Sequence, residues 1–147
     1  MEAEGEEEKI ILSKLNIIPE TTEINKGVNV EVEVLAKEDI VNVEWIIQYT
    51  VDVALKRKII ILQKKKQSVD VYKKEEKYEE RFEIEDVDFS FEGVSRKDLF
   101  NVGLFSIIAR QTISPEKHED LITINMVTQI TKNDEGALIK TIINPLE

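Results

Sequence analysis

The chain has 147 residues, contains no cysteine and carries a formal net charge of −10 at pH 7. These properties exclude disulfides and thiolate metal sites, favour a reducing intracellular compartment, and argue against direct binding of nucleic acid. The longest aliphatic run, Ile59 to Leu62, is far too short to span a membrane, so we expect a soluble protein the size of one domain.

The N-terminal part of the chain predicts a tail followed by strands of alternating polarity. Residues 1–8 are rich in glutamate and predict a disordered acidic tail, which leaves residues 9–147 as a single domain. Residues 9–18 predict a first strand that Pro19 ends. A second strand begins after Gly27, where valines at every second position from Val28 to Val34 alternate with polar residues.

The middle of the chain continues this pattern. A long third strand is predicted over residues 43–53, with Trp45 on its inward row, and a fourth over residues 58–63. Residues 64–76 have no clear period and indicate an exposed loop or a short helix. A fifth strand is predicted over residues 77–85, where Phe82 and Ile84 alternate with charged residues.

The C-terminal part predicts an irregular segment and three more strands. Residues 86–98 are irregular, and we expect Phe89 and Phe91 to hold them against the core. The sixth strand, residues 100–111, is apolar on both faces and is therefore expected at the centre of a sheet. A turn at residues 114–117, a seventh strand over 121–131, a hairpin turn at 132–136 and an eighth strand over 138–143 complete the domain.

Seven or eight short strands without intervening helices predict an all-β fold. We expect an immunoglobulin-like antiparallel β-sandwich, because cores of that kind often hold a tryptophan on the third strand, the position of Trp45 here.

The sequence offers few residues for catalysis or metal binding. The one histidine, His118, stands in a charged turn without evident partners for a metal site or a catalytic triad. Residues 86–90 resemble the start of a calcium loop, but Phe91 and Lys97 occupy the positions that need glycine and glutamate. We therefore expect no catalytic residue, no metal and no other cofactor. Because carboxylates are plentiful, an enzyme remains as the least favoured alternative.

Basic residues are concentrated in one segment. Residues 56–81 hold ten of the 20 lysines and arginines but only five acidic residues, and the rest of the chain has 10 basic and 25 acidic residues, a net of −15. Such a segment favours an acidic partner, so we predict that Lys64, Lys65 and Lys66 bind a protein partner. The alternative is that the charges only keep the surface solvated.

The sixth strand carries two alternating rows, and one of them must face away from the core. Leu104, Ser106, Ile108 and Arg110 form one row, and the other runs from Gly103 to Ala109. An apolar row that faces outward from a central strand is typical of an interaction surface, so the first row is the second predicted binding site. In the alternative interpretation, a loop or a tail covers the outward row.

Two stretches resemble a known protein family. The Val-Glu-Trp-Ile-Ile-Gln-Tyr stretch at residues 43–49 is similar to the Leu-Glu-Trp-Lys-Ile-Ile-Tyr strand of the anti-silencing-function histone chaperones. The stretch from Gly93 to Ile108 is similar to that family's turn and following Val-Gly strand, and the order of strands agrees over about residues 10–131. The resemblance implies an acidic immunoglobulin-like sandwich that holds a core-histone heterodimer.

The family's functional positions map onto different residue types here. Its exposed valine on the central strand falls at about Ser106, and its acidic pair before the Glu-Trp strand falls at about Val41 and Asn42. The lysine-rich residues 64–74 have no counterpart in the family.

Two hypotheses follow, and both describe a non-enzymatic protein-binding domain without a membrane partner. The first is a divergent histone chaperone, which would bind core histones in the nucleus. The second is an adaptor or scaffold domain of a cytoplasmic assembly, which would bind through an edge strand and the basic residues 56–81.

Overall fold

The computed structural model describes residues 8–53 and 56–146, so that nearly all of the expected tail at residues 1–8 lies outside the described residues. The described strands form two antiparallel sheets. The smaller sheet has the order β1-β3-β6 and contains β1 (Ile10–Ile18), β3 (Asn29–Ala36) and β6 (Lys77–Glu83). The larger sheet has the order β2-β9-β8-β7-β4-β5 and contains β2 (Thr21–Glu23), β9 (Leu138–Ile142), β8 (Lys117–Lys132), β7 (Gly103–Ser114), β4 (Val43–Val53) and β5 (Lys56–Lys66).

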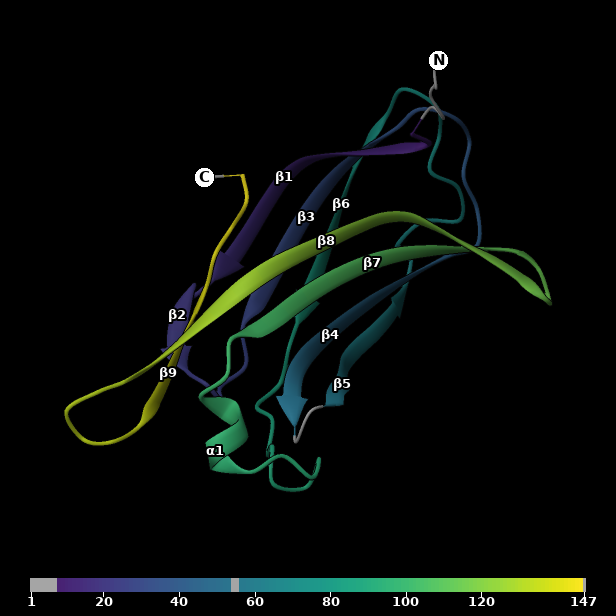
Figure 1. The fold of residues 1–147 in the computed structure, drawn as a ribbon. Helices are drawn as coiled ribbons and strands as arrows, with labels where there is room; N and C mark the ends of the chain where they lie inside the picture. The colour runs from purple at the N-terminus through teal and green to yellow at the C-terminus, as the bar shows by residue number, and fades with distance from the viewer. Residues whose placement is uncertain (1–7, 54–55, 147) are drawn as a thin grey trace, which may run out of the picture.

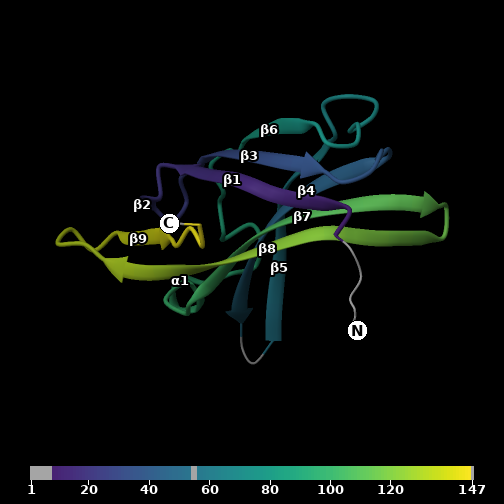
Figure 2. The same ribbon diagram turned by 90° about the horizontal axis from the view of Figure 1, so that it is seen from above.

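The two sheets face each other, so the predicted antiparallel β-sandwich is confirmed (Figure 1). Seen from above, β1, β3 and β6 lie on one side and β7, β8 and β9 on the other (Figure 2). The strand order is immunoglobulin-like: β1, β3 and β6 take the places of strands A, B and E, and β5, β4, β7 and β8 those of C′, C, F and G. The β7–β8 and β8–β9 hairpins extend beyond opposite sides of the sandwich (Figures 1 and 2).

The core lies between the sheets and consists of the inward rows that alternation predicted. In β3 the valines at positions 30, 32 and 34 are fully buried, and in β4 the buried residue Trp45 packs its ring against Phe82 of the opposite sheet, with 5.9 Å between ring centroids. Gly103 begins the inward row of β7, where an added Cβ would lie only 1.8 Å from the Tyr49 hydroxyl oxygen. The close approach of the Tyr49 side chain therefore requires glycine at this position.

Several predicted elements differ from the structure. The described residues form nine strands rather than seven or eight, because the three-residue strand β2 pairs with β9. Residues 64–66 belong to β5 instead of to a loop or a short helix, since all three pair with β4. The sixth strand begins at Gly103 rather than at residue 100, and the helix α1 (Arg96–Leu99) begins inside the segment expected to be irregular, residues 86–98, and ends one residue beyond it.

The prediction that Phe89 and Phe91 hold residues 86–98 against the core is right for Phe89 and wrong for Phe91. Phe89 is buried and packs against Tyr49 with 5.8 Å between ring centroids, so it does hold the segment against the core. Phe91, two residues later, is 88% exposed. The turns at residues 89–93 are closed by backbone hydrogen bonds such as that from Gly93 N to Ser90 O, and Phe91 lies within them, facing away from the core.

Candidate partner-binding surface

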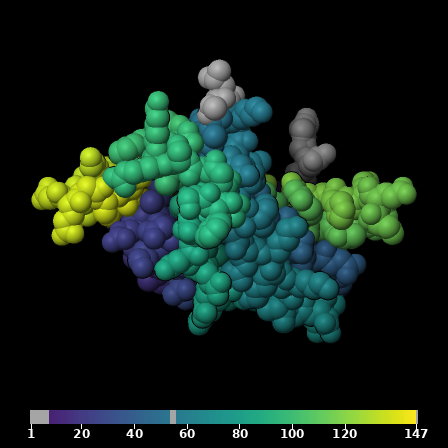
Figure 3. Space-filling view, turned by 90° about the horizontal axis from the view of Figure 1, so that it is seen from below, coloured from purple at the N-terminus to yellow at the C-terminus, as the bar shows by residue number. Residues whose placement is uncertain are grey.

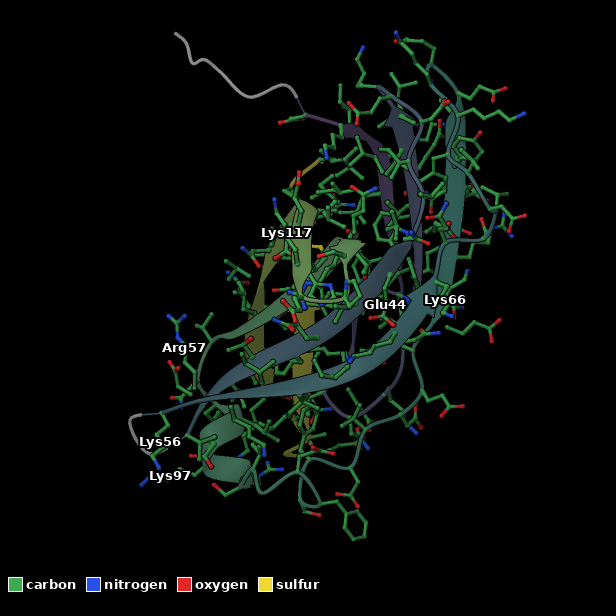
Figure 4. The ribbon with its side chains drawn as sticks, turned by 90° about the vertical axis from the view of Figure 1, so that its right-hand side faces the viewer. Glu44, Lys56, Arg57, Lys66, Lys97 and Lys117 are labelled. Carbon is green, nitrogen blue, oxygen red and sulfur yellow. The ribbon has the colours of Figure 1, made fainter. Side chains whose placement is uncertain are left out.

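The pairing of β4 with both of its neighbours brings the two predicted binding sites onto one face. Lys66 lies opposite Glu44 on β4, and Glu44 lies opposite Arg110 on β7. One step along, Lys64 is opposite Ile46, which is opposite Ile108. Side chains in such rows point to the same side of a sheet. This side is the outer face of the larger sheet, and Figure 4 shows Glu44 and Lys66 next to each other on it.

The outward row of β7 is the one that begins at Leu104. Its alternate, which runs from Gly103 to Ala109, belongs to the core. Ser106 and Ile108 face outward but are only 1% and 8% exposed, so neighbouring side chains shield most of the row. The Ser106 hydroxyl donates to Asn125 Oδ1 at 2.7 Å, and Arg110 Nε donates to Asp120 Oδ1 at 2.7 Å. Leu104, which is partly exposed, offers the row's apolar surface.

Exposed aliphatic side chains of neighbouring strands extend this apolar surface. Ile59 and Ile61 of β5 are 53% and 48% exposed, and they pair with Thr50 and Gln48 of the outward row of β4. Val127 of β8, opposite Leu104, is also exposed. The resulting outer surface combines an aliphatic centre with cations at its β5 border. We call Arg57, Ile59, Ile61, Lys64 and Lys66, which all pair with the outward row of β4, the β5 surface.

The strand β5 is an edge strand whose charged residues are all basic. Within the described residues it pairs with β4 alone, which leaves its other edge without a neighbouring strand. Its 11 residues include six lysines and arginines and no acidic residue. Arg57 lies 4.0 Å from Asp52, an exposed and weak pair. In the part of the chain that the structure describes, Lys64 and Lys66 make no ion pair. The β5 surface therefore presents positive charge that the described residues do not neutralise.

Lys65 lies on the opposite face and does not belong to this surface. Its Nζ donates to Arg81 O at 2.8 Å, lies 3.4 Å from Glu80 Oε1, and stands 5.2 Å from the centroid of the Phe82 ring. Lys65 thus bridges β5 to β6, the edge strand of the smaller sheet. Of the three predicted lysines, the structure brings Lys64 and Lys66 together with the β7 row and separates Lys65 from them.

The partner of Lys65 is part of a buried polar network. Glu80 is fully buried on the inward row of β6, and its Oε2 accepts hydrogen bonds from Ser68 N at 2.8 Å and from the Tyr72 hydroxyl. The Tyr72 oxygen also accepts from Trp45 Nε1 at 3.0 Å. Burial, together with Glu80, raises the pKa of Tyr72 far above its ordinary value. This network therefore links β4 of the larger sheet and the residues after β5 to β6 of the smaller sheet.

Sequence reasoning missed this network although a signal was present. Glu80 stands on the same alternating row as Phe82 and Ile84, which predicts an inward side chain. A carboxylate in such a row needs buried partners, and Tyr72 and Lys65 provide them.

The other residues considered for chemistry make local contacts. His118 lies on the exposed β7–β8 hairpin, with Nδ1 3.3 Å from Thr112 Oγ1. In the calcium-like stretch, Asp86 accepts a hydrogen bond from Gly27 N, which lowers the pKa of that carboxyl, and Asp88 accepts from Ser90 N. Among the described residues, no three histidine, cysteine or acidic side chains are grouped so that they could hold a metal ion.

Comparison with known proteins leaves the fold as the main guide to function. No family model matches the chain, and neither does any curated protein. In the described parts of the chain, no helix has the length and apolar character needed to cross a membrane. The resemblance to histone chaperones therefore stays a prediction.

Proposed function

We propose that the chain is a protein-binding module of the adaptor type, which docks an acidic segment of a partner on the β5 surface and the adjoining outward row of β7. The observation that carries this proposal is the pairing of Lys64 and Lys66, through β4, with the row that includes Ile108 and Arg110. An aliphatic centre gives such a surface area to bury, and cations at its border select acidic partners and speed their association.

The first test is affinity capture from a native lysate with three forms of the full chain. The wild type is compared with the double variant K64E/K66E and with K97E/K132E, which changes net charge by the same amount at exposed lysines elsewhere. We expect one acidic partner to bind the wild type and the control, and to be lost with K64E/K66E. Equal recovery of every bound protein by all three forms would rule out the role given to the β5 surface.

A second candidate is the histone-chaperone function, which the charge distribution favours. The chain outside residues 56–81 carries a net charge of −15, which would attract basic histones. Ser106, where the family's exposed valine would fall, is only 1% exposed and adds no support. The test is gel filtration of the full chain with a core-histone heterodimer at about 150 mM salt, a concentration that screens weak surface attraction. Co-elution supports this candidate, and separate elution of the two proteins ends it.

A further inference from the structure

The strongest feature that the proposed function leaves unused is an exposed aromatic side chain on an acidic turn. Residues 85–92, which we call the acidic knob, contain Glu85, Asp86, Asp88 and Glu92 and no basic residue. Phe91 at its tip is 88% exposed, the highest exposure among the large apolar side chains of the described residues. Because that side chain is so exposed, folding alone gives no reason for a phenylalanine there.

The backbone of the acidic knob is held in one shape. Phe91 N donates to Asp88 O at 3.2 Å, and Glu92 N donates to Phe89 O at 3.0 Å. The Asp88 carboxylate accepts from Ser90 N at 3.0 Å, while Phe89 fixes the base of the turn in the core. An aromatic side chain on a turn that is already ordered binds with little further loss of conformational entropy. The acidic knob therefore holds the exposed Phe91 side chain on an ordered turn, as a binding contact requires.

The surface that would accept this anchor needs an apolar centre bordered by cations, and the chain itself has one. On the β5 surface, Ile59 and Ile61 are about half exposed, with Arg57 on one side and Lys64 on the other. The acidic knob is its complement in both charge and polarity. A second copy of the chain is therefore the partner whose chemistry the described residues specify.

The two surfaces lie at the same end of the molecule. Asn101 Nδ2 donates to Asp52 O at 2.9 Å, and Asp52 pairs with Arg57, which ties the segment after the acidic knob to the tip of the β4–β5 hairpin. Figure 3 shows this end, where the green segment of residues 86–102 lies beside the blue and teal strands β4 and β5. Two copies related by a two-fold axis can therefore offer both surfaces to each other.

We infer that the protein self-associates as a two-fold dimer, in which the acidic knob of each copy places Phe91 on the β5 surface of the other. The dimer shares the β5 surface with the proposed function, and a foreign acidic segment would compete with it. Its test uses the purified chain alone, so either idea can fail while the other stands.

The test is sedimentation equilibrium of the full chain over a range of concentrations. We expect a dimer at high concentration that weakens as salt is raised, because ionic screening reduces the attraction between the two surfaces. Phe91→Ala should raise the dimer dissociation constant at least tenfold. Ile113→Ala removes another exposed apolar side chain, 46% exposed, from the β7–β8 hairpin and should leave the constant unchanged. A wild type that stays monomeric at every concentration overturns the inference.

A charge exchange separates this contact from other modes of dimerisation. The variants E85K/E92K and R57E/K64E should each be monomeric, since each then presents two surfaces of like charge. Mixed in equal amounts, they should form a heterodimer in which both contacts are again complementary. Dimers of either variant alone, or a mixture that does not associate, would contradict the proposed contact.

Discussion

The outer faces of the two sheets both carry many charges, but the charges are arranged differently. On the smaller sheet they alternate in sign and pair across strands: Glu33 lies 3.6 Å from Lys14 and 3.7 Å from Lys77. Arg81 there lies 3.8 Å from Glu31. On the outer face of the larger sheet, β5 presents Arg57, Lys64 and Lys66 and no acidic residue, and among the described residues only Arg57 of these three makes an ion pair. The charges of the smaller sheet neutralise one another and need no partner. Within residues 8–53 and 56–146, most cations of the β5 surface have no acidic side chain paired with them, so this surface is the better candidate for binding.

The largest effect on stability is expected at Lys65, the one lysine of the run from Lys64 to Lys66 that faces the interior. Lys65→Met leaves the buried Glu80 carboxylate without its ion pair, so we expect the free energy of unfolding to fall by about 3 kcal/mol. Lys64→Met, on the outer face, should change it by less than about 0.5 kcal/mol. Urea denaturation of both variants measures this. Equal values for the two would show that β5 does not divide its lysines between two faces.

A second prediction concerns a partly buried lysine that donates to backbone carbonyls. Lys140 Nζ donates to Ile24 O at 3.1 Å and to Lys26 O at 2.5 Å, and burial lowers the pKa of Lys140 to about 8. Between pH 8 and the ordinary lysine value, the unfolded chain binds a proton that the folded chain does not. The stability from Lys140 therefore grows as pH rises through this window and is lost as pH falls to 8.

The measurement compares urea denaturation of the wild type and Lys140→Met at pH 8, 9 and 10. The wild type should gain about 1 kcal/mol per pH unit relative to the variant, close to the limit for one proton. Parallel pH profiles for the two proteins would show that the Lys140 amine keeps an ordinary pKa.

The smallest effect is expected on the smaller sheet, where Glu33 pairs with two lysines. Glu33→Gln should lower the free energy of unfolding by no more than about 0.5 kcal/mol, because exposed pairs contribute little and are screened by salt. It should also leave capture of a partner unchanged. Loss of the partner with this variant would show that the partner binds the smaller sheet rather than the β5 surface.

Alternation predicted the sandwich and most of its core, because the inward rows of β3 and β4 are apolar at every second position. Alternation failed to predict structure where apolar and polar residues do not alternate. In the run from Lys64 to Lys66 the residue type is constant, so nothing marks Lys65 as the inward side chain or the run as a strand. Phe91 was misplaced because an aromatic residue in an irregular segment carries no period from which to predict its direction.

The candidate site was only half predictable for a related reason. Sequence alone offered the β7 row that begins at Leu104 and the lysine run as separate features, and nothing in it placed the two on one face. They lie on one face only because β4 stands between β5 and β7, a strand order that is fixed by contacts distant in sequence. The buried carboxylate of Glu80 depends in the same way on the Tyr72 side chain, which a connecting segment brings to it.

The most direct test of the binding surface is amide chemical-shift mapping of the full chain as the captured partner is added. Changes should concentrate on β5 and on the outward rows of β4 and β7, with Ile61, Lys64 and Lys66 among the largest. The paired face of the smaller sheet should stay unchanged. Shifts confined to β1, β3 and β6, with none along β5, would contradict the account.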